Sequence, residues 1–331
     1  MEKEHIKKIL VTRTDNIGDV VLTLPVITEL RKIFPSSKIN FLVQSYIADL
    51  VKGYPGIDEV ISFENDLTFK QKLNLFKEIN PDIAIVVYPT FEIALLLMMA
   101  KVQYRIGSGY RWFSFMFNKR VYFHRKHSTK HESQYNLDLL KGIDKNFVPG
   151  EIMFFFKTDE RTLKSVKDKL LKEGISPDQR YIIIHPGSRG SAKDLPKISY
   201  KTLIENIHTK FKSLYIYLTG VEDEKKLIEE VMIKGERVYN LAGMFTLREL
   251  VTLINGCDVF ISNSTGPIHI AGALNKKIIG FYPQSKPMNP ERWKPLSKEC
   301  IILTPIVDDD MNTIKPSDIF NAFQKLYLGT N

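Results

Sequence analysis

The sequence predicts an α/β protein built from two doubly wound parallel sheets. Three observations support this: short apolar runs alternate with segments of helical periodicity, the alternation restarts near residue 181, and turn-forming residues separate the two series. The 331 residues also suit two domains at roughly 100–200 residues each. We expect domains at 1–155 and 156–315 facing a central cleft, and a final helix within 316–331 that could pack on either domain, including back on the N-terminal one.

The first series forms the N-terminal domain. Apolar runs predict strands at Lys8–Thr12, Ile39–Val43, Glu59–Phe63 and Ile83–Tyr88, with a short further strand at Arg105–Gly107. Helical spacing predicts helices at Val20–Phe34, Tyr46–Gly53, Leu67–Ile79 and Phe91–Lys101. The most apolar window, Ile83–Ala100, contains Pro89 and Glu92 and falls short of a membrane span of ~20 residues, so we assign it to a buried strand and helix.

The second series forms the C-terminal domain. Strands are expected at Tyr181–His185, Leu214–Thr219, Arg237–Asn240, Val259–Ser262 and Lys277–Tyr282. Helices are expected at Tyr200–Phe211, Glu224–Ile233, Leu247–Asn255, Pro267–Leu274 and Pro316–Leu328. Between the two series, Val148–Asp178 carries a charged helix flanked by turns.

Composition excludes several classes of protein. Hydrophobic residues make up 44% of the chain and charged residues 26%, which excludes a predominantly disordered protein. The two cysteines, Cys257 and Cys300, cannot form a disulfide framework and fit a reducing compartment. The N-terminal residues lack the apolar run of a secretion signal. We therefore expect a cytoplasmic protein.

Much of the net charge of +9 comes from Lys101–His131, here called the basic segment. It contains eight Lys and Arg residues and no Asp or Glu, and aromatic residues lie among the charges. Such a segment attracts polyanions, which could be nucleic acid, anionic lipid headgroups or phosphorylated glycans. A solvated basic face is the simpler alternative. No known nucleic-acid-binding signature accompanies the segment, so we expect no nucleic-acid partner.

The first candidate motif, TRTDNIGDVVLTLP at Thr12–Pro25, joins the first strand to the first helix. Gly18 permits close backbone approach, and Asp19 lies at the predicted helix start, where the helix dipole stabilises a negative charge. A carboxylate there could deprotonate a hydroxyl as a general base, or it could only cap the helix. Asp15, in the loop, is a weaker candidate. No GxGxxG is present, which argues against a dinucleotide dehydrogenase.

Two further motifs carry groups that bind anions. HPGSRGSAKDLP at His185–Pro196 combines Ser188 with the charge of Lys193, and it suits a diphosphate or is an ordinary polar turn. SNSTGPIHIAGAL at Ser262–Leu274 places hydroxyl and N–H groups at a helix N-terminus, which is typical of a phosphate site. Its histidine, His269, could touch phosphate or be a buried structural residue.

The last two motifs could hold a nucleoside. LTGVEDEKK at Leu218–Lys226 places Glu222 at a helix start, where it could bind ribose hydroxyls or complement the helix dipole. NLAGMFTLREL at Asn240–Leu250 offers Met244 and Phe245 as a surface for adenine, although such a pair is more often part of a core. No residues have metal-ligand spacing, so we expect no metal site.

Taken in their order along the chain, the five motifs together resemble the heptosyltransferases of lipopolysaccharide core synthesis, glycosyltransferase family 9, over about Lys8–Leu303. The resemblance implies the GT-B fold, in which two Rossmann-like domains bind the acceptor (N-terminal domain) and the nucleotide-sugar donor (C-terminal domain). It also implies metal-independent, inverting transfer without a cofactor, from ADP-heptose to a lipopolysaccharide core or related cell-surface glycan.

The resemblance also implies residue roles. The family's general base falls on Asp19, its donor-binding lysine on Lys193 and its ribose-binding carboxylate on Glu222. The adenine-side turn falls on Met244 and Phe245. The other donor contacts are implied at Ser188, Ser264, Thr265, Gly266 and His269, and we expect acceptor contacts at Gly18, Arg111 and Arg120.

One position departs from the family. Many members have Asp before the Thr-Gly of the third motif, where this chain has Ser264, which can hydrogen-bond a sugar hydroxyl but brings no charge. The donor could therefore be ADP-heptose or another nucleotide sugar. The basic segment would hold an anionic lipid-linked glycan, with peripheral contact at the inner membrane. A nucleotide-sugar epimerase of the same fold is the alternative enzyme, and a two-lobed binding protein is a non-catalytic alternative.

Overall fold

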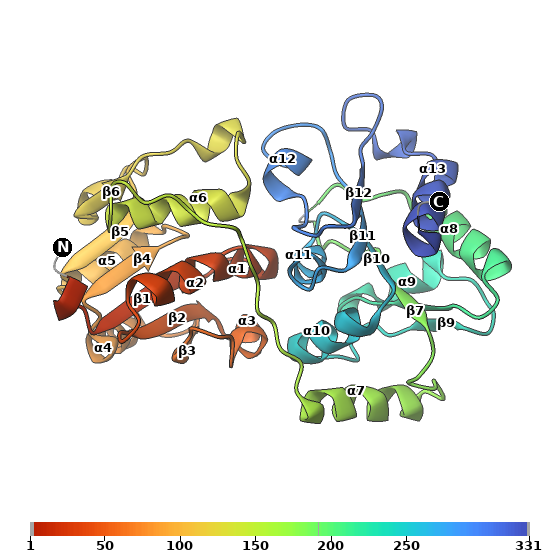
Figure 1. Ribbon diagram of the computed structural model, residues 1–331, viewed down its shortest axis with the longest axis horizontal. Coiled ribbons are helices and arrows are strands. Elements are labelled where there is room, and N and C mark those ends of the chain that lie inside the picture. The colour runs from red at the N-terminus through yellow and green to blue at the C-terminus, as the bar shows by residue number, and fades with distance from the viewer. Residues whose placement is uncertain (1–2, 191, 330–331) are drawn as a thin grey trace. The chain divides into compact units, whose positions relative to one another are not determined.

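The chain folds into two compact α/β units, each with its own parallel sheet (Figure 1). The computed structural model describes residues 3–190 and 192–329. The division between the units lies between Phe155 and Phe156. In the described residues, no helix has both the length and the apolar character needed to cross a bilayer.

The sheet of the first unit has the order β3-β2-β1-β4-β5-β6, with parallel neighbours throughout. Its strands are β1 (Lys8–Arg13), β2 (Lys38–Gln44), β3 (Glu59–Phe63), β4 (Ile83–Val86), β5 (Tyr104–Ser108) and β6 (Lys119–Val121). Its α-helices are α1 (Ile17–Val21), α2 (Leu24–Ile33), α3 (Ser45–Val51), α4 (Phe69–Ile79), α5 (Phe91–Met99) and α6 (Glu132–Asp138). The short 3₁₀ turns are η1 (Lys3–His5), η2 (Ser114–Met116), η3 (Arg125–His127) and η4 (Leu139–Gly142).

The second unit repeats this topology with the order β12-β11-β10-β7-β8-β9. Its strands are β7 (Tyr181–His185), β8 (Tyr215–Leu218), β9 (Val238–Asn240), β10 (Val259–Asn263), β11 (Lys277–Phe281) and β12 (Cys300–Leu303). Its α-helices are α7 (Glu160–Lys172), α8 (Lys197–Lys210), α9 (Lys225–Val231), α10 (Leu247–Gly256), α11 (Gly266–Ala273), α12 (Pro290–Trp293) and α13 (Pro316–Leu328), with η5 (Glu222–Glu224) and η6 (Met311–Thr313) as 3₁₀ turns.

The strand order of each sheet reverses at its centre, between β1 and β4 in the first unit and between β7 and β10 in the second. These four strands are almost wholly buried, as expected where helices cover both faces of a parallel sheet. Ligands of open α/β sheets bind beyond the carboxyl ends of the strands at such a reversal. The topology therefore gives each unit one position for a site.

The first helix differs from the sequence prediction, which began it at Val20 and continued it to Phe34. The structure begins α1 at Ile17, ends it at Val21 and restarts the helix as α2 at Leu24. Pro25 has no N–H to continue the hydrogen-bond ladder. Asp19 is therefore the third residue of α1, inside its first turn.

The edge strands β6 and β12 were not predicted. β6 has only three residues, two of them exposed cations, and every residue of β12 is partly exposed. β6 has no apolar run to reveal it, whereas β12 is apolar (Cys-Ile-Ile-Leu) but only four residues long.

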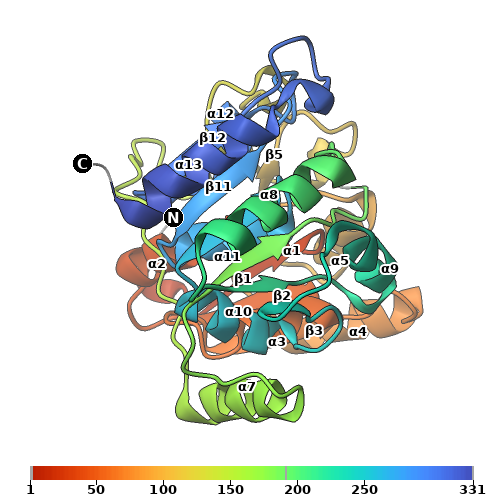
Figure 2. The same cartoon turned by 90° about the vertical axis from the view of Figure 1, so that its right-hand side faces the viewer.

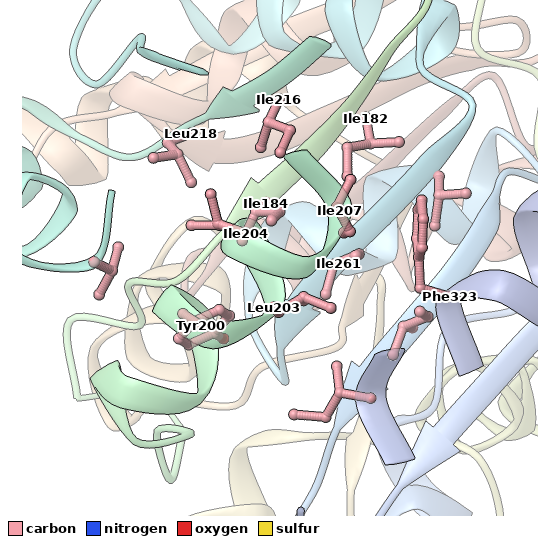
Figure 3. Packing of buried hydrophobic residues seen from close by; sticks show 14 of the residues in the cluster. Ile182, Ile184, Tyr200, Leu203, Ile204, Ile207, Ile216, Leu218, Ile261 and Phe323 are labelled. Carbon is pink, nitrogen blue, oxygen red and sulfur yellow. The ribbon is translucent and has the colours of Figure 1, made fainter. Parts of the chain in front are cut away.

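The final helix, α13, packs on α8 and β11 of the second unit. Ile319, Phe323 and Leu326 of α13 belong to the buried cluster that includes residues of α8 and β10. α13 and α8 lie side by side in both views (Figures 1 and 2). Figure 3 shows Leu203 and Ile207 of α8 among the side chains of this cluster.

Candidate functional site

The candidate base, Asp19, lies just beyond the carboxyl end of β1. Because α1 begins at Ile17, the carboxylate is in the first turn, where the helix dipole stabilises negative charge. Its Oδ1 accepts a short hydrogen bond from Nη2 of Arg13, and its Oδ2 is 3.5 Å from Nδ2 of Asn16. The side chain is 14% exposed, so Asp19 is oriented by the protein yet still open to solvent.

Arg13 is a buried cation that joins three carboxylates. It is the last residue of β1 and is 2% exposed. Its Nε donates to Asp15 at 2.7 Å, Nη2 pairs with Asp19, and Nη1 is 3.5 Å from Glu132. A planar guanidinium can serve several acceptors at once, which an ammonium group cannot do in the same geometry. Arg13 therefore fixes the side chain of Asp19 relative to the sheet.

Helix α6 completes this cluster from a distant part of the chain. Glu132, at its first position, is 1% exposed and also lies 3.4 Å from Nε of Arg125. Asn136, one turn later, accepts from Arg13 at 3.2 Å and from Arg125 at 2.8 Å, and it donates to the Leu22 carbonyl at 3.1 Å. This amide links the two arginines to the break between α1 and α2.

The electrostatics of the cluster follow from its burial. Burial disfavours the charged guanidinium of Arg13, but the carboxylates of Asp19, Asp15 and Glu132 outweigh it and raise the pKa of Arg13. Burial raises the pKa of Asp15 to about 6, opposed by Arg13 and reinforced by Asp19. Asp15 therefore changes its charge at mildly acid pH, beside the candidate base.

The raised pKa of Asp15 predicts a pH-dependent stability. The folded protein binds a proton at Asp15 more tightly than the unfolded chain, so the stabilisation is complete below the ordinary value of 3.8 and is lost as pH rises through about 6. The wild type should lose roughly 3 kcal/mol across this window relative to Asp15→Asn. Urea unfolding of both proteins between pH 4 and 7 measures the difference. If the difference in unfolding free energy between the two proteins did not change with pH, the raised pKa of Asp15 would be contradicted.

A cavity of about 620 Å³ lies at the carboxyl ends of β1 to β4. Its lining includes the carboxylates Asp15, Glu64 and Asp66 and the aromatic rings of Tyr46 and Tyr88, but no Lys, Arg or His. Carboxylate oxygens can accept hydrogen bonds from hydroxyls, and aromatic rings can cover the apolar face of a sugar. The cavity therefore suits a neutral polyhydroxylated group more than an anion.

The structure does not join every predicted acceptor residue to this cluster. Gly18 is buried in α1, next to Asp19. Arg111 and Arg120 are exposed, in the loop after β5 and in β6. No side-chain contact ties either arginine to Asp19 or Arg13 among the described residues, so their role as acceptor contacts remains a prediction.

In the second unit, Asn263 links two of the predicted donor loops. It is the last residue of β10 and fully buried. Its Oδ1 accepts from the Leu195 N–H at 3.0 Å, and its Nδ2 donates to the Pro186 carbonyl at 2.9 Å and to Asp194 at 3.0 Å. The loop after β7 is therefore fastened to the turn after β10, which carries Ser264, Thr265 and Gly266.

This role of Asn263 predicts a defined loss. Asn263→Ala leaves buried backbone groups of the loop without partners, which should cost about 1–3 kcal/mol of unfolding free energy and weaken ADP binding. Asn255→Ala, at an exposed position of α10, is the matched control and should change stability by less than about 0.5 kcal/mol. Urea unfolding and calorimetric titration with ADP measure both effects. If Asn263→Ala had the unfolding free energy and the ADP affinity of the wild type, the link between the two loops would be unimportant.

Lys193 is held by an ion pair at this end of the sheet. Its Nζ lies 2.9 Å from Oδ2 of Asp309, and Oδ1 of the same carboxylate accepts from the backbone N–H groups of Gln284 and Ser285. The hydroxyl of Ser285 and Lys193 lower the pKa of Asp309 further below its usual range. Lys193 itself remains about half exposed, so its charge is available to a ligand.

The remaining predicted phosphate contacts lie at the start of α11, within α11 and in the loop after β7. Thr265 is the N-cap residue, and its hydroxyl lies 3.0 Å from that of Ser262. Gly266 begins the helix, so its end presents backbone N–H groups. Ser188 accepts from the Gly190 N–H at 3.2 Å. His269 is buried inside α11, with its ring 6.2 Å from that of Trp293.

The structure brings the predicted nucleoside residues together. A side chain at Gly243 would overlap the carboxylate of Glu222, so Glu222 lies against the turn that contains Met244 and Phe245. Phe245 is covered by the ammonium of Lys169, 5.7 Å from the ring centroid. Glu222 is largely exposed and pairs with Lys225 at 2.7 Å.

A second carboxylate, Glu224, was missed by the sequence analysis. It is 8% exposed, accepts from the Val221 N–H at 2.9 Å and lies where side chains at Gly187 or Gly220 would otherwise be. It therefore faces the loops after β7 and β8. Gly187 and Gly220 were the available sign of this carboxylate in the sequence, because glycine is needed where another group approaches the backbone closely.

The sequence analysis also missed Arg13, Glu132 and Asn136. Arg13 could have been found as a cation at the carboxyl end of a central strand whose middle residues, Ile9 to Val11, are apolar. Glu132 and Asn136 gave no such signal, since only the tertiary fold brings α6 to β1. In the described ranges, no group of three or more His, Cys, Asp or Glu side chains could hold a metal ion.

Known proteins resemble this chain over its whole length. The profile of glycosyltransferase family 9 (heptosyltransferase) matches residues 70–317. A putative glycosyltransferase of Haemophilus influenzae is 29% identical, covering 98% of this chain and 96% of the relative. Lipopolysaccharide heptosyltransferase 1 of Campylobacter coli is 23% identical, covering 83% of each chain.

Solved structures confirm the predicted fold class. The ADP-heptose lps heptosyltransferase II of Escherichia coli superposes with a TM-score of 0.84 at 22% identity, covering 97% of this chain and 98% of that structure. The fold is GT-B, with two Rossmann-like sheets. Because the family profile spans most of the sequence, the protein belongs to glycosyltransferase family 9, the heptosyltransferase family, and is a glycosyltransferase.

Proposed function

We propose that the protein is an inverting heptosyltransferase that moves heptose from ADP-heptose to a lipopolysaccharide core or related cell-surface glycan. The observation that carries this proposal is Asp19 in the first turn of α1, held by the buried Arg13 and open to solvent. The names of family relatives, among them the C. coli lipopolysaccharide heptosyltransferase, support the donor and acceptor classes.

The proposed reaction is a single displacement. The carboxylate of Asp19 takes the proton from an acceptor hydroxyl, and the oxygen forms a bond to the anomeric carbon of the donor sugar. The bond between that carbon and the diphosphate oxygen breaks with its electron pair, and ADP leaves. Attack from the face opposite the diphosphate inverts the anomeric centre. Arg13 touches neither substrate and acts as a positioning residue for Asp19.

The second unit supplies the groups that would bind the donor. Lys193 and the N–H groups at Thr265 and Gly266 would offset the charge that develops on the departing diphosphate, and Ser188 would donate to it. These dipoles are fixed before the reaction, because Asn263 fastens the two loops together. Electrostatic stabilisation of this kind costs little reorganisation during the reaction.

The nucleoside would lie between Glu222 and the turn at Met244 and Phe245. We retain Glu222 as the proposed ribose-binding carboxylate and add Glu224 as a second candidate, because it is buried against the loops after β7 and β8. Comparing donor KM for Glu222→Gln and Glu224→Gln would assign the role to one of them. Ser264 and His269 remain proposed donor contacts.

The acceptor would bind to the first unit. Its reacting sugar suits the cavity lined by Asp15, Tyr46 and Tyr88, which has no cation in its lining. The anionic part of the acceptor would then meet the basic segment, including Arg111 and Arg120, in contact with the inner membrane surface. This division predicts that a neutral terminal sugar is preferred over an acidic one.

A panel of nucleotide sugars tests the donor assignment. ADP-heptose should raise the melting temperature, whereas UDP- and GDP-sugars should not. Lys193→Ala should weaken ADP-heptose binding about tenfold or more, through loss of a charged hydrogen-bond donor. Lys197→Ala removes a lysine of similar exposure nearby and should leave the affinity unchanged. Stabilisation by another nucleotide sugar alone would replace ADP-heptose as the donor.

The epimerase alternative is tested with the same material. An epimerase would convert the nucleotide sugar without any acceptor, and free isomerised donor would appear in the mixture. We expect unchanged donor in the absence of acceptor, apart from slow hydrolysis. Isomerised nucleotide sugar, observed by NMR, would overturn the transferase proposal.

A further inference from the structure

A group of large apolar side chains is exposed on and beside α5. Phe91, Met98 and Met99 lie on α5 with exposed fractions of 41%, 37% and 44%, while Trp112 and Phe115, in the basic segment, are 75% and 64% exposed. We call these five residues the aromatic surface. Single exposed apolar residues are ordinary, but a contiguous group usually marks an interaction site.

The aromatic surface is continuous across the two segments. The rings of Phe91 and Trp112 stack with centroids 5.1 Å apart, and the ring of Trp112 meets Phe113 edge-on at 5.5 Å. Phe113 is buried in the core together with residues of α5. The exposed side chains are therefore anchored to a packed base. Phe91 and Met98, seven positions apart, share one face of the helix.

Exposed cations are chain neighbours of these side chains. Lys101 follows α5 and Arg111 directly precedes Trp112, and both are exposed. The segment from Lys101 to His131 has no Asp or Glu. The one acidic residue of α5, Glu92, is paired with Lys72 at 3.0 Å. The surface thus combines apolar side chains with a net positive rim.

We infer that the aromatic surface, with Lys101 and Arg111, docks the protein on a bilayer that contains anionic lipids. Trp and Phe side chains partition into the region between headgroups and acyl chains, while Lys and Arg pair with anionic headgroups. A soluble polyanion would use the cations but leave five apolar side chains in water. A protein partner would not need a rim of one charge.

The surface lies close in the chain to the proposed acceptor cavity. Tyr88 lines that cavity, and Phe91 begins α5 three residues later. Docking here would bring the cavity near the membrane surface, where a lipid-linked acceptor is held. This consequence rests on the proposed function, but the docking itself depends only on the aromatic surface and its charges.

Vesicle flotation of the full-length protein tests the inference without donor or acceptor. Vesicles of phosphatidylcholine with phosphatidylglycerol should float the wild type, and pure phosphatidylcholine should float much less. Trp112→Ser with Phe115→Ser should lower binding to the anionic vesicles about tenfold or more, because two large apolar side chains no longer insert. Lys101→Glu with Arg111→Glu should remove the preference for anionic vesicles, at about fivefold for each lost charge.

Leu171→Ser with Ile198→Ser is the matched control, because both residues are exposed apolar side chains of the second unit. This control should bind like the wild type. Equal flotation of the control and the Trp112/Phe115 variant, or no flotation of the wild type on glycan-free vesicles, would overturn the inference. A wild-type dimer that the Trp112/Phe115 variant converts to monomer, with no vesicle binding, would assign the surface to a second copy instead.

An activity comparison separates this inference from the proposed function. The Trp112/Phe115 variant should lose much more transfer rate on acceptor embedded in vesicles than on a detergent-free, water-soluble acceptor fragment. Loss of both rates with normal vesicle binding would contradict the link between docking and catalysis. Normal docking by a wild type that lacks transferase activity would leave the surface assigned and overturn only the proposed reaction.

Discussion

Asp19→Asn should lower kcat for sugar transfer by about 10²–10⁴-fold, because an amide cannot take the proton from the acceptor hydroxyl. The substitution keeps the size of the side chain. Water can replace the hydrogen bond that Asn16 donates to Asp19. Donor binding should change little, since the proposed donor contacts belong to the other unit. Steady-state kinetics with varied donor and acceptor, together with calorimetric titration of ADP, measure both quantities.

Asp15→Asn is the control for this prediction, because Asp15 contacts the same arginine. It should retain most of the transfer rate at pH 7 and show an altered pH dependence. If Asp15→Asn lost activity while Asp19→Asn kept it, the base would be Asp15. Full activity in Asp19→Asn would remove Asp19 from the mechanism altogether.

Arg13→Met should have the largest effect on stability. It removes the buried cation between Asp15, Asp19 and Glu132, and unpaired buried charges typically cost 3–5 kcal/mol, so we expect a loss of about that size. Transfer should fall by about 10²-fold or more in the molecules that remain folded, because Asp19 is no longer held in place. Urea unfolding and kinetics below the unfolding temperature measure the two losses.

A second substitution distinguishes burial of charge from a general packing defect. Asp15→Asn in the Arg13→Met background removes a buried carboxylate that Arg13 had neutralised, so it should recover part of the lost stability without recovering activity. Arg111→Met, at an exposed arginine, should leave stability within about 0.5 kcal/mol of the wild type. An Arg13→Met protein as stable as the wild type would contradict the role of the cluster.

The central strands and most helices could be predicted because burial leaves a pattern in the sequence. Strands such as KILVTR and YIIIH contain a continuous apolar run in their middle, as buried parallel strands require. The same logic failed for β6, which is short and exposed. The break after Val21 also escaped prediction, since the apolar spacing continues through Leu22 and Leu24 and only Pro25 signals a change.

The candidate site was predictable only in part, for a related reason. Asp19, Lys193 and the Thr265–Gly266 turn each belong to a local motif at a strand end, so their chemistry is visible in sequence. Asn263 and Glu132 act through partners distant in sequence: Asn263 bonds to Leu195, and Glu132 to Arg13. Such long-range contacts exist only once the sheet has formed, and no local spacing reveals them.

The most direct measurement compares ADP binding and single-turnover transfer in the same preparations of wild type, Asp19→Asn and Lys193→Ala. The two proposed roles are separable, because Asp19 deprotonates the acceptor and Lys193 binds the donor. We predict that Asp19→Asn binds ADP like the wild type yet transfers almost no sugar, whereas Lys193→Ala binds ADP more weakly. Transfer at the wild-type rate by Asp19→Asn, or loss of its ADP binding, would contradict this division of labour.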